Sequence, residues 1–282
     1  MAYTTIDDPS AHFQTITYSG NGASRSITNT GNSDLKPDWV WIKERNNAIS
    51  HRIFDSNRGA TKRMFSNNSD AESTQSNSLT AFNTDGFSLG DGGSVNGGSD
   101  TYVAWQWAAN GGTTSSNTNG TITTTVQANT TAGFSIVTFT GNGASQTVGH
   151  GLNQAPVLTI RKRRNTTGDW FVHTNIFDGG MDYLKLNTTG ASSSSSLANF
   201  TSTTGGADDN SDQYVVYFFH SVKGYSKIDT YTGNGNANGA FVYTGFKPKW
   251  LMTKNTNGTA ANWHIYDSER NTFNVIGEQL YA

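Results

Sequence analysis

A run of alternating apolar and polar residues that closes in Gly-Asn-Gly occurs three times in this chain. The runs cover 13–22, 134–143 and 225–235. Alternation with a period of two predicts a β-strand with one face toward a core and the other toward water. Gly and Asn tolerate positive φ, so Gly-Asn-Gly predicts a tight turn after each strand. A strand and turn that return three times predict one structural unit used repeatedly.

Further short strands are expected through the first unit, separated by clusters of Gly, Asn, Ser and Asp. No stretch shows a sustained 3.6-residue apolar period, so any helix is expected to be short. Three of the four prolines, Pro37, Pro156 and Pro248, precede a predicted strand in each unit, where they remove no ladder hydrogen bond. The further strands predicted in the first unit are 24–27, 39–45, 51–55, 78–82, 86–89 and 102–107.

The positions of the units divide the chain into five segments: a leader (1–12), a first repeat (13–107), a linker (108–133), a second repeat (134–222) and a partial third repeat (223–282). Within the linker, residues 121–126 are rich in Thr and β-branched residues, which favours as an alternative an extra strand that pairs with a neighbouring domain or subunit. The third repeat stops before its aromatic strand, and a half sandwich exposes its core and strand edges. The favoured expectation is that the chain continues beyond Ala282; completion by another subunit and a poorly folded tail are the alternatives.

Composition supports an all-β fold. Aromatic residues make up 12% of the 282 residues, which is enough for real cores, and Thr, Asn and Gly are abundant while Leu and Lys are few. We therefore predict tandem antiparallel β-sandwiches of the jelly-roll or concanavalin-like type, the third one incomplete.

Charge and cysteine content exclude several classes of function. Only 14% of residues are charged and the net charge is −2, which argues against nucleic-acid binding because no basic surplus exists to neutralise phosphates. The absence of cysteine excludes disulfides and thiolate metal sites. No apolar run approaches transmembrane length and the N-terminus lacks the features of a secretory signal, so we expect synthesis in a cytoplasm and no membrane insertion.

The chain contains no familiar catalytic motif, so we assign no catalytic residue and expect no cofactor. A His followed by an aromatic-Asp pair recurs at 51–55, 173–178 and 264–267. Such a pair could orient a nucleophile or hold a metal. A structural role at a strand end is the favoured interpretation, because three equivalent copies of one catalytic dyad would be unusual.

Two loops rich in Asn, Asp and Gly precede the last strand of the first two repeats, where a binding surface could vary without disturbing a sandwich. Asp208, Asn210 and Asp212 place oxygens at alternate positions, as at the start of a calcium loop, but the glycine and terminal glutamate of such a loop are absent, so an exposed acidic turn is favoured over a metal site. The candidate ligand-binding residues are Asp91, Asn96, Asp100, Asp208, Asp209, Asn210 and Asp212.

One basic cluster, Arg161-Lys-Arg-Arg164, follows a predicted strand. It is interpreted as a solvated hairpin end, with contact to an anionic glycan or an acidic subunit as the alternative.

Stretches of the leader and first repeat are similar in sequence to known proteins. They are Met1–Ser10, Tyr18–Gly22, Lys36–Arg45, Phe54–Arg63 and Phe82–Phe87. These stretches resemble virion proteins of marine bacteriophages, many of them described as tail fibres or structural proteins. The resemblance covers the first repeat closely, and the later repeats keep only part of the text. It implies a lectin-like β-sandwich within a virus particle and supplies no catalytic residue.

The resemblance implies a non-enzymatic protein of the virion, made in the host cytoplasm. The leading hypothesis is a tail fibre or adhesin whose leader docks to other virion proteins and whose later domains face the host surface and its glycans. We expect a homo-oligomer, since trimers are common among such fibres. One alternative is a capsid decoration or head-fibre protein that clamps shell subunits. Another is a glycan-degrading tail spike, which would need paired carboxylates in a cleft.

Overall fold

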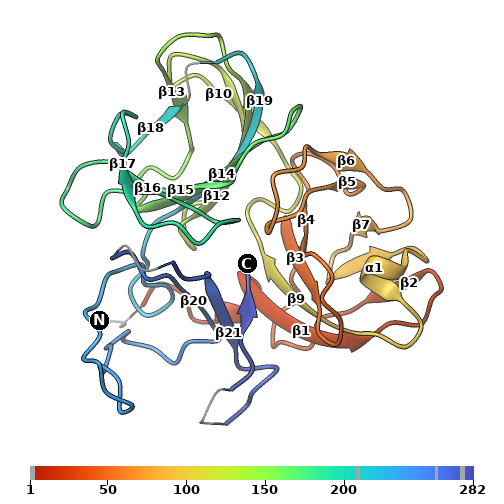
Figure 1. The fold of residues 1–282 in the computed structure, drawn as a ribbon. Helices are drawn as coiled ribbons and strands as arrows, with labels where there is room; N and C mark the ends of the chain where they lie inside the picture. The colour runs from red at the N-terminus through yellow and green to blue at the C-terminus, as the bar shows by residue number, and fades with distance from the viewer. Residues whose placement is uncertain (1–3, 208–209, 258–259, 274–276) are drawn as a thin grey trace.

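The chain folds almost entirely into β-strands. The computed structural model describes residues 4–207, 210–257, 260–273 and 277–282. Within these ranges the strands form several antiparallel sheets, so the predicted all-β sandwich fold is confirmed. Figure 1 shows three lobes arranged around a shared centre. Neither of the short helices in this part of the chain is long or apolar enough to cross a membrane.

Lobe 1 is a sandwich of a four-stranded sheet, ordered β1-β9-β3-β4, and a three-stranded sheet, ordered β2-β8-β7. A two-stranded ribbon of β5 and β6 flanks it. Its elements are η1 (Pro9–Ala11), β1 (Phe13–Ser19), β2 (Arg25–Ile27), β3 (Trp39–Glu44), β4 (Arg52–Asp55), β5 (Lys62–Arg63), β6 (Ser73–Thr74), β7 (Leu79–Phe82), β8 (Phe87–Leu89), α1 (Gly93–Asn96) and β9 (Thr101–Trp107).

Lobe 2 pairs an eight-stranded sheet, ordered β10-β11-β12-β19-β14-β15-β16-β17, with a two-stranded sheet of β13 and β18. The segment 108–133 supplies β10 and β11 to this sheet, and β11 overlaps the extra strand considered for 121–126. The strands are β10 (Ser115–Asn117), β11 (Thr124–Asn129), β12 (Phe134–Thr140), β13 (Gln146–Gly149), β14 (Leu158–Arg163), β15 (Phe171–Thr174), β16 (Asp182–Lys185), β17 (Ser193–Ser194), β18 (Thr204–Ala207) and β19 (Gln213–Phe219).

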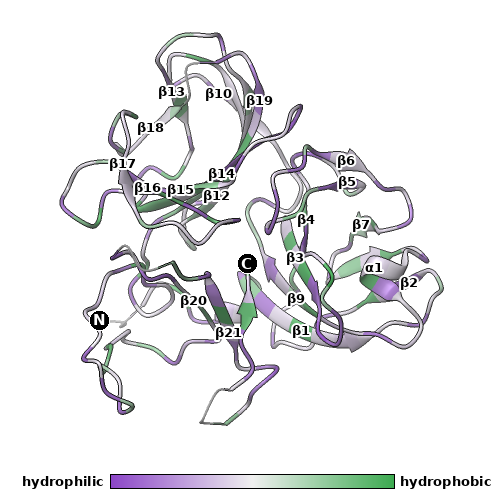
Figure 2. Cartoon of the chain, viewed as in Figure 1, coloured by the Kyte–Doolittle hydropathy of each residue, from purple (hydrophilic) through white to green (hydrophobic). Residues whose placement is uncertain are grey.

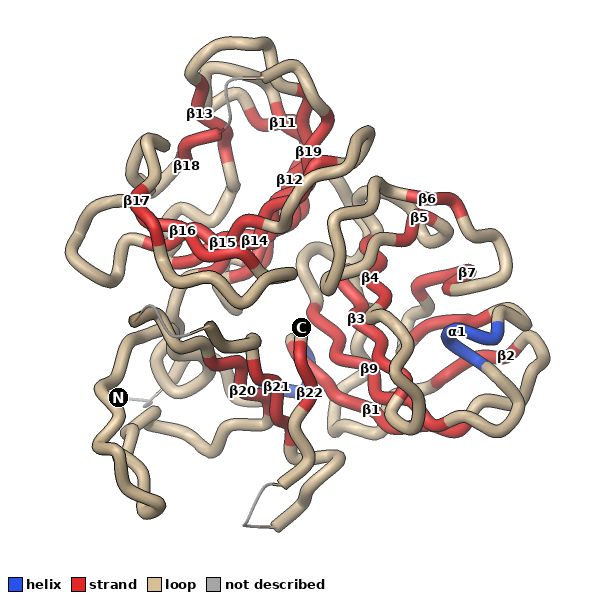
Figure 3. The backbone as a smooth tube through the Cα atoms, in the orientation of Figure 1, coloured by secondary structure: helices blue, strands red, loops and turns tan. Residues whose placement is uncertain are grey.

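Lobe 3, the described part of 223–282, has one three-stranded sheet, ordered β20-β21-β22. Its strands are β20 (Trp250–Thr253), β21 (His264–Asp267) and β22 (Leu280–Tyr281). Figure 3 shows that most of this lobe is loop.

The strand registers of the three lobes correspond. Trp39 of β3 lies opposite Trp107 of β9 and Asp55 of β4. In lobe 2, Leu158 of β14 lies in the same way opposite Phe219 of β19 and Thr174 of β15. In lobe 3, Trp250 of β20 lies opposite Asp267 of β21. These pairings define equivalent positions in the three lobes.

The strand expected at the start of the third unit does not form. The equivalent strands β1 and β12 pair with the aromatic strands β9 and β19. In lobe 3 no described strand takes the place of β9 or β19, so the segment from Tyr225 to Tyr231 has no ladder partner and stays irregular. The turn that follows is nevertheless present, because Gly22, Gly143 and Gly235 all have positive φ, at 68°, 79° and 66°.

Strand β3 begins with four consecutive apolar residues and faces two cores. Val40 and Ile42 point into the core of lobe 1, between its two sheets. Trp39 and Trp41 point the other way, and all six residues of the strand are buried. Both faces of the strand are therefore buried, because another lobe covers the side that carries the tryptophans.

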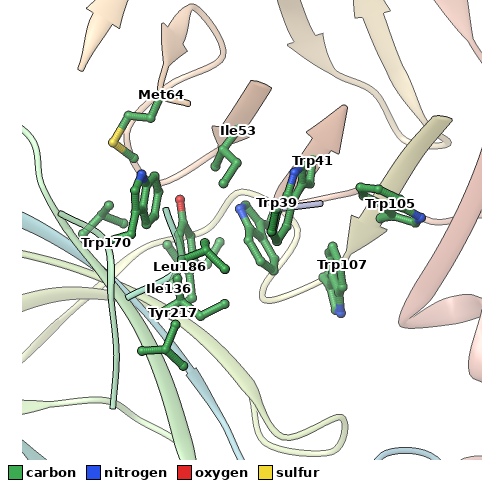
Figure 4. Close-up of a cluster of buried hydrophobic side chains, with 14 of the residues drawn as sticks. Trp39, Trp41, Ile53, Met64, Trp105, Trp107, Ile136, Trp170, Leu186 and Tyr217 are labelled. Atoms are coloured by element: carbon green, nitrogen blue, oxygen red, sulfur yellow. The ribbon is translucent and has the colours of Figure 1, made fainter. Parts of the chain in front are cut away.

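The second core, which we call the central core, contains residues from all three lobes. The indole of Trp39 stacks on the ring of Tyr217 of lobe 2, with centroids 4.5 Å apart, and Trp107 meets Trp250 of lobe 3 edge-on at 5.4 Å. Figure 4 shows Trp39 of lobe 1 facing Tyr217, Ile136 and Leu186 of lobe 2. Figure 2 shows hydrophobic segments on the strands around the centre and mainly hydrophilic outer loops. Burial of these large rings is the main force that holds the lobes together.

Candidate functional site

The junction of lobes 1 and 2 contains a buried charged network. Asp55, the last residue of β4, accepts hydrogen bonds from the backbone N–H and the Nε of Arg58, and from the hydroxyl of Tyr217 at 2.6 Å. Glu72 joins the two lobes, because it binds Arg58 at 3.0 Å and Arg164 of lobe 2 at 3.0 Å. The side chains of Asp55 and Arg58 are fully buried.

The network sets the ionisation of its members. Burial alone would raise the pKa of Glu72, but hydrogen bonds and charge from Arg164 and Arg58 outweigh it, and the pKa is lowered. Burial would lower the pKa of Arg58, but Asp55, Tyr217 and Glu72 together raise it. Burial, followed by the charge of Asp55, raises the pKa of Tyr217 well above its ordinary value. The hydroxyl of Tyr217 therefore keeps the proton that it donates to Asp55.

The junction of lobes 3 and 1 repeats this arrangement. Asp267 accepts from the backbone N–H of Arg270 at 2.9 Å and from its Nε at 2.6 Å. The Nε1–H of Trp105, at the position equivalent to Tyr217, donates to Asp267 at 3.0 Å. Arg45 of lobe 1, equivalent to Arg164, binds Glu278 of lobe 3 at 3.3 Å. The two junctions therefore share one arrangement, in which an aromatic side chain of one lobe donates a hydrogen bond to an aspartate of another lobe.

The strand registers correct the equivalence predicted for the recurring His and Asp residues. Asp55 and Asp267 are equivalent, but Thr174 and not Asp178 occupies their position in lobe 2. Asp178 is exposed in the turn after β15 and accepts from Gly180 N–H at 2.8 Å. The sequence alignment misled because Phe54-Asp55 ends strand β4, whereas Phe177-Asp178 comes after the end of β15 at Thr174. No shared dyad exists, and Asp55 and Asp267 serve arginine pairs.

A second set of equivalent contacts closes the arrangement of the lobes. Trp170 Nε1 of lobe 2 donates to the carbonyl of Phe65 in lobe 1 at 2.7 Å, and Trp263 Nε1 of lobe 3 donates to that of Lys185 in lobe 2 at 2.9 Å. His51 of lobe 1 stands at the same position and faces the backbone of Tyr281 in lobe 3 without the geometry of a hydrogen bond. Each lobe therefore contacts the next, and the three lobes form a closed ring.

The basic cluster belongs to the junction of lobes 1 and 2, and the prediction of a solvated hairpin end is wrong for most of it. Lys162 is fully buried, and its Nζ donates to the carbonyls of Ser69 and Arg163 at 3.3 and 3.0 Å. Burial, followed by the charge of Arg163, lowers the pKa of Lys162 to about 8. Arg164 is held by Glu72. Lys162 and Arg164 are covered because a loop of lobe 1 packs over the strand end.

The candidate ligand-binding residues of lobe 1 contact their own lobe. Asn96 is buried, and its Nδ2 donates to the carbonyls of Ala23 and Gly90 at 2.7 and 2.9 Å. Asp91 accepts from Asn77 at 3.0 Å, while Asp100 accepts from Asn46 and Asn47 at 3.2 and 3.1 Å. Asn96 thus anchors the loop to the Gly-Asn-Gly turn, and the two aspartates cap neighbouring loops.

The corresponding loop of lobe 2 is described in part. Asp208 and Asp209 lie outside the described residues. The side-chain oxygen of Asn210 accepts from the hydroxyl of Tyr214, and Asp212 pairs with Arg163 at 3.4 Å. Among the residues that the structure describes, no group of three His, Asp or Glu side chains is placed to hold a metal ion.

A hollow of about 220 Å³ on lobe 2 brings together residues that the sequence did not single out as a group. Its floor is aromatic: Phe171 and Tyr183 have ring centroids 5.3 Å apart, and His173 lies beside both. Ser194–Ser196, Arg161 and Leu197 complete the lining.

The histidine in this hollow has one free polar atom. The guanidinium of Arg161 donates to His173 Nε2 at 3.4 Å, so the ring proton is on Nδ1, which has no partner among the described residues. Burial, followed by the charge of Arg161, lowers the pKa of His173 well below its ordinary value, so the ring is neutral. The hollow therefore combines two aromatic residues with several serines, and the Nδ1–H of His173 is buried beside it without a partner in the described part of the chain. Regular alternation along β15 and β16 was the only sequence signal for it.

A second hollow, of about 330 Å³, lies between lobes 1 and 3. Its charged groups are already engaged, since Arg45 pairs with Glu278, and Arg270 binds Asp267 and the carbonyl of Glu278. It is part of the lobe junction, and the hollow on lobe 2 is the better candidate for a ligand.

Comparison with known proteins gives a family and nothing beyond it. No curated protein and no solved structure matches this chain. One family model covers residues 8–282 and so includes all three lobes together with the charged junctions and the hollow on lobe 2. The chain belongs to this family, DUF7483, a domain of unknown function.

Proposed function

We propose that this protein is a non-enzymatic structural component of a bacteriophage particle, of the tail-fibre or adhesin kind. The observation that carries the structural part is the closed ring of lobes. The buried Asp55 and Asp267, with their arginines and aromatic donors, are committed to holding one lobe against the next. Because its buried charges and tryptophans fix the lobes to one another, the chain is suited to a rigid structural role.

The phage part of the proposal depends on the sequence resemblance. The text of Met1–Ser10 and of the first repeat is similar to virion proteins of marine phages. On this proposal the protein is located in the virion, and the leader (1–12) docks to other virion proteins. A homotrimer is the expected assembly, and the mass of the protein in solution, measured by light scattering, tests it.

The adhesin part is supported by the hollow on lobe 2. Flat apolar faces of a sugar ring can pack on Phe171 and Tyr183. Hydroxyl groups of the sugar can pair with Ser194–Ser196. A neutral or weakly acidic glycan of the host surface is the class of ligand that fits, since Arg161 adds one positive charge.

The location of the protein on purified particles tests the proposal most directly. Gold-labelled antibodies should bind at the tail. Binding on the shell would instead favour a capsid decoration protein, an alternative that the exposed aromatics of lobe 3 support, with Phe241 90% and Tyr243 68% exposed. Absence from particles that infect normally would refute both.

Binding to host surface polysaccharide tests the hollow. Tyr183→Ala should weaken binding by at least about tenfold if one stacking face is lost. Tyr243→Ala, which removes an exposed tyrosine of lobe 3, is the matched control and should leave binding unchanged. Equal binding by both variants would remove the hollow from the proposal. Release of reducing sugar from the polysaccharide would overturn the non-enzymatic part and revive the tail-spike alternative.

A further inference from the structure

Lobes 1 and 2 share one turn sequence, Gly-Asn-Gly-Ala-Ser, at residues 20–24 and 141–145. The turn follows β1 in lobe 1 and β12 in lobe 2. In an Asn-Gly step the backbone N of the glycine can reach the side-chain amide of the asparagine, because glycine has no Cβ to obstruct the approach. The two copies have the same sequence, so a difference in the reactivity of Asn21 and Asn142 has to come from the structure around them.

The two asparagines have the same local geometry. Asn21 Oδ1 accepts a hydrogen bond from Ala23 N–H at 3.0 Å, and Asn142 Oδ1 accepts one from Ala144 N–H at 3.1 Å. The glycine after each asparagine has positive φ, 68° in lobe 1 and 79° in lobe 2. Such an Asx turn folds the side-chain amide back toward the N of that glycine. Both asparagines are exposed, so water reaches both.

In lobe 1 the turn is held by Asn96, which is fully buried. Gly22 N–H donates to the backbone carbonyl of Asn96 at 2.8 Å, and Asn21 N–H donates to its Oδ1 at 3.1 Å. Asn96 Nδ2 donates in turn to the carbonyl of Ala23 at 2.7 Å. The N–H that would have to react with the side chain of Asn21 is therefore already engaged, and the other two bonds fix the turn around it.

Both turns lie against the loop that precedes the aromatic strand. Gly20 N–H donates to the carbonyl of Asp100 at 2.8 Å, and Gly141 N–H donates to that of Asp212 at 2.9 Å, so the two loops correspond. At the position of the clamping asparagine, four residues before Asp212, lobe 2 has Asp208. Asp208 lies outside the described residues, and an aspartate has no side-chain N–H to donate.

The turn of lobe 2 has fewer bonds. Asn142 N–H donates to Oε1 of Gln146 at 3.2 Å. Gly143 N–H has no hydrogen-bond partner among the residues that the structure describes. This N–H lies next to the side-chain amide of Asn142, and Gly143 is exposed. Its loss of a proton and its movement toward Cγ of Asn142 therefore break no hydrogen bond.

Other Asn-Gly steps show why these two are the pair to compare. At Gly97, Gly111 and Gly239 the glycine N–H is bonded to a carbonyl or carboxylate oxygen. Gly120 and Gly235 have no such partner in the described part of the chain, but the residues after them differ from Ala-Ser. Only the turns of lobes 1 and 2 combine one sequence with two environments.

We propose that Asn142 is a site of spontaneous deamidation through a cyclic imide, and that the contacts of Asn96 protect Asn21 from the same reaction. The backbone N of Gly143 gives up its proton to water or hydroxide and attacks Cγ of Asn142. The new C–N bond closes a succinimide ring as the bond from Cγ to Nδ2 breaks, and the amide nitrogen takes up a proton and leaves as ammonia. Water then opens the ring at either carbonyl and leaves isoaspartate or aspartate at position 142. The step needs neither an oxidant nor a cofactor, only the approach of two groups that the turn already holds close together.

The reaction changes the charge and the length of the turn. Both products carry a carboxylate where the chain has a neutral amide, beside the loop in which Asp212 pairs with Arg163 at 3.4 Å. Isoaspartate also adds one carbon to the main chain between β12 and β13, which alters the spacing of the donor at 142 from Gln146. The inference concerns the chemistry of one turn and holds whether or not the protein is part of a phage.

Peptide mapping of the folded 282-residue chain tests the proposal. The protein is kept folded at mildly alkaline pH, samples are digested with chymotrypsin, and mass spectrometry follows the peptides that contain Asn21 and Asn142. Isoaspartate is identified by methylation with an isoaspartyl methyltransferase. We expect Asn142 to convert at least about tenfold faster than Asn21, because the turn of lobe 1 first has to give up its bonds to Asn96.

The unfolded chain is the matched control. In urea the identical pentapeptides should deamidate at similar rates, because the contacts of Asn96 are lost. Asn142→Gln should abolish the product in lobe 2 and leave Asn21 as slow as before, since the longer side chain does not readily close a five-membered ring. Asn96→Ala should bring the rate at Asn21 toward that at Asn142. If the Asn96→Ala variant does not fold, the comparison of the folded and unfolded parent chain still decides.

Two results would overturn the inference. One is conversion of Asn142 no faster than that of Asn21 in the folded chain. The other is no conversion of Asn142 in the folded chain over a time in which the unfolded chain converts at both sites.

Discussion

The hydrogen bond from the hydroxyl of Tyr217 to Asp55 gives a specific prediction about the stability of the fold. The hydroxyl crosses from lobe 2 to lobe 1 and donates to Asp55 at 2.6 Å, and both residues are fully buried. Tyr217→Phe removes this single oxygen. The ring itself, which stacks on Trp39 at 4.5 Å, is retained, so the change tests the hydrogen bond and not the packing.

The size of the effect follows from the charge of the acceptor. A hydrogen bond to a charged group contributes about 1.5–3 kcal/mol, and one to a neutral group about 0.5–1.5 kcal/mol. Asp55 keeps its bonds to Arg58 in the variant, so no bare buried charge is created. We therefore expect Tyr217→Phe to lower the free energy of unfolding by about 1.5–3 kcal/mol.

Urea denaturation measures this change. At an m-value of roughly 3 kcal/mol per M, the midpoint should fall by about 0.5–1 M. Tyr18→Phe is the matched control, because its hydroxyl donates to the neutral carbonyl of Val95 at 2.8 Å and its ring stacks on Tyr102 at 5.1 Å. If Tyr217→Phe costs no more than Tyr18→Phe, the charged junction does not hold the lobes together as argued.

Three further predictions concern the junctions and the buried titratable groups. Glu72→Gln should destabilise the protein by about 3 kcal/mol at pH 7. Because the pKa of Glu72 is lowered on folding, its contribution is present above about pH 4.5 and lost as pH falls through the lowered pKa, so the difference in stability between the parent and the variant should shrink as pH falls below about 4.5. Burial, followed by the charge of Lys43, lowers the pKa of His51 to about 3, so only the unfolded chain takes up a proton between about pH 6.5 and pH 3, and the free energy of unfolding falls as the pH is lowered. His51→Gln should remove about 2 kcal/mol of the stability loss between pH 7 and pH 5, measured by urea titrations at each pH. Parallel pH curves for the variant and the parent would contradict this. Trp263→Phe, which removes the bond to Lys185, should cost about 1–3 kcal/mol and speed limited proteolysis of lobe 3 relative to lobes 1 and 2; unchanged cleavage there would show that this contact does not hold the lobe.

Strand positions were predictable because their signals are local. Alternation, turn residues and proline placement set most strands of lobe 1, and the positive φ of Gly22, Gly143 and Gly235 agrees with the turns predicted at Gly-Asn-Gly. These features depend on the conformational preferences of a few neighbouring residues. The strand expected after Tyr225 failed for a reason outside its own sequence, since a strand needs a partner.

The candidate sites depended on contacts that the sequence does not specify. Asn96 looked like a loop residue open to ligands, yet it is buried because the Gly-Asn-Gly turn folds over it. Lys162 looked solvated, yet a loop of lobe 1 covers it. Phe171, His173 and Tyr183 line one hollow because β15 and β16 pair in a register that aligns them, and a pairing register is not encoded by either strand alone.

The sequence by itself determined that this chain is all β, where most strands and turns of its first lobe lie, and that it carries aromatic residues at alternating positions. Only the tertiary structure decided what those aromatics face. Trp39, Trp105 and Tyr217 lie between lobes, and Asp55 and Asp267 find their partners across those junctions. Local preferences act within a few residues along the chain, whereas burial of a strand's second face depends on which distant surface packs against it.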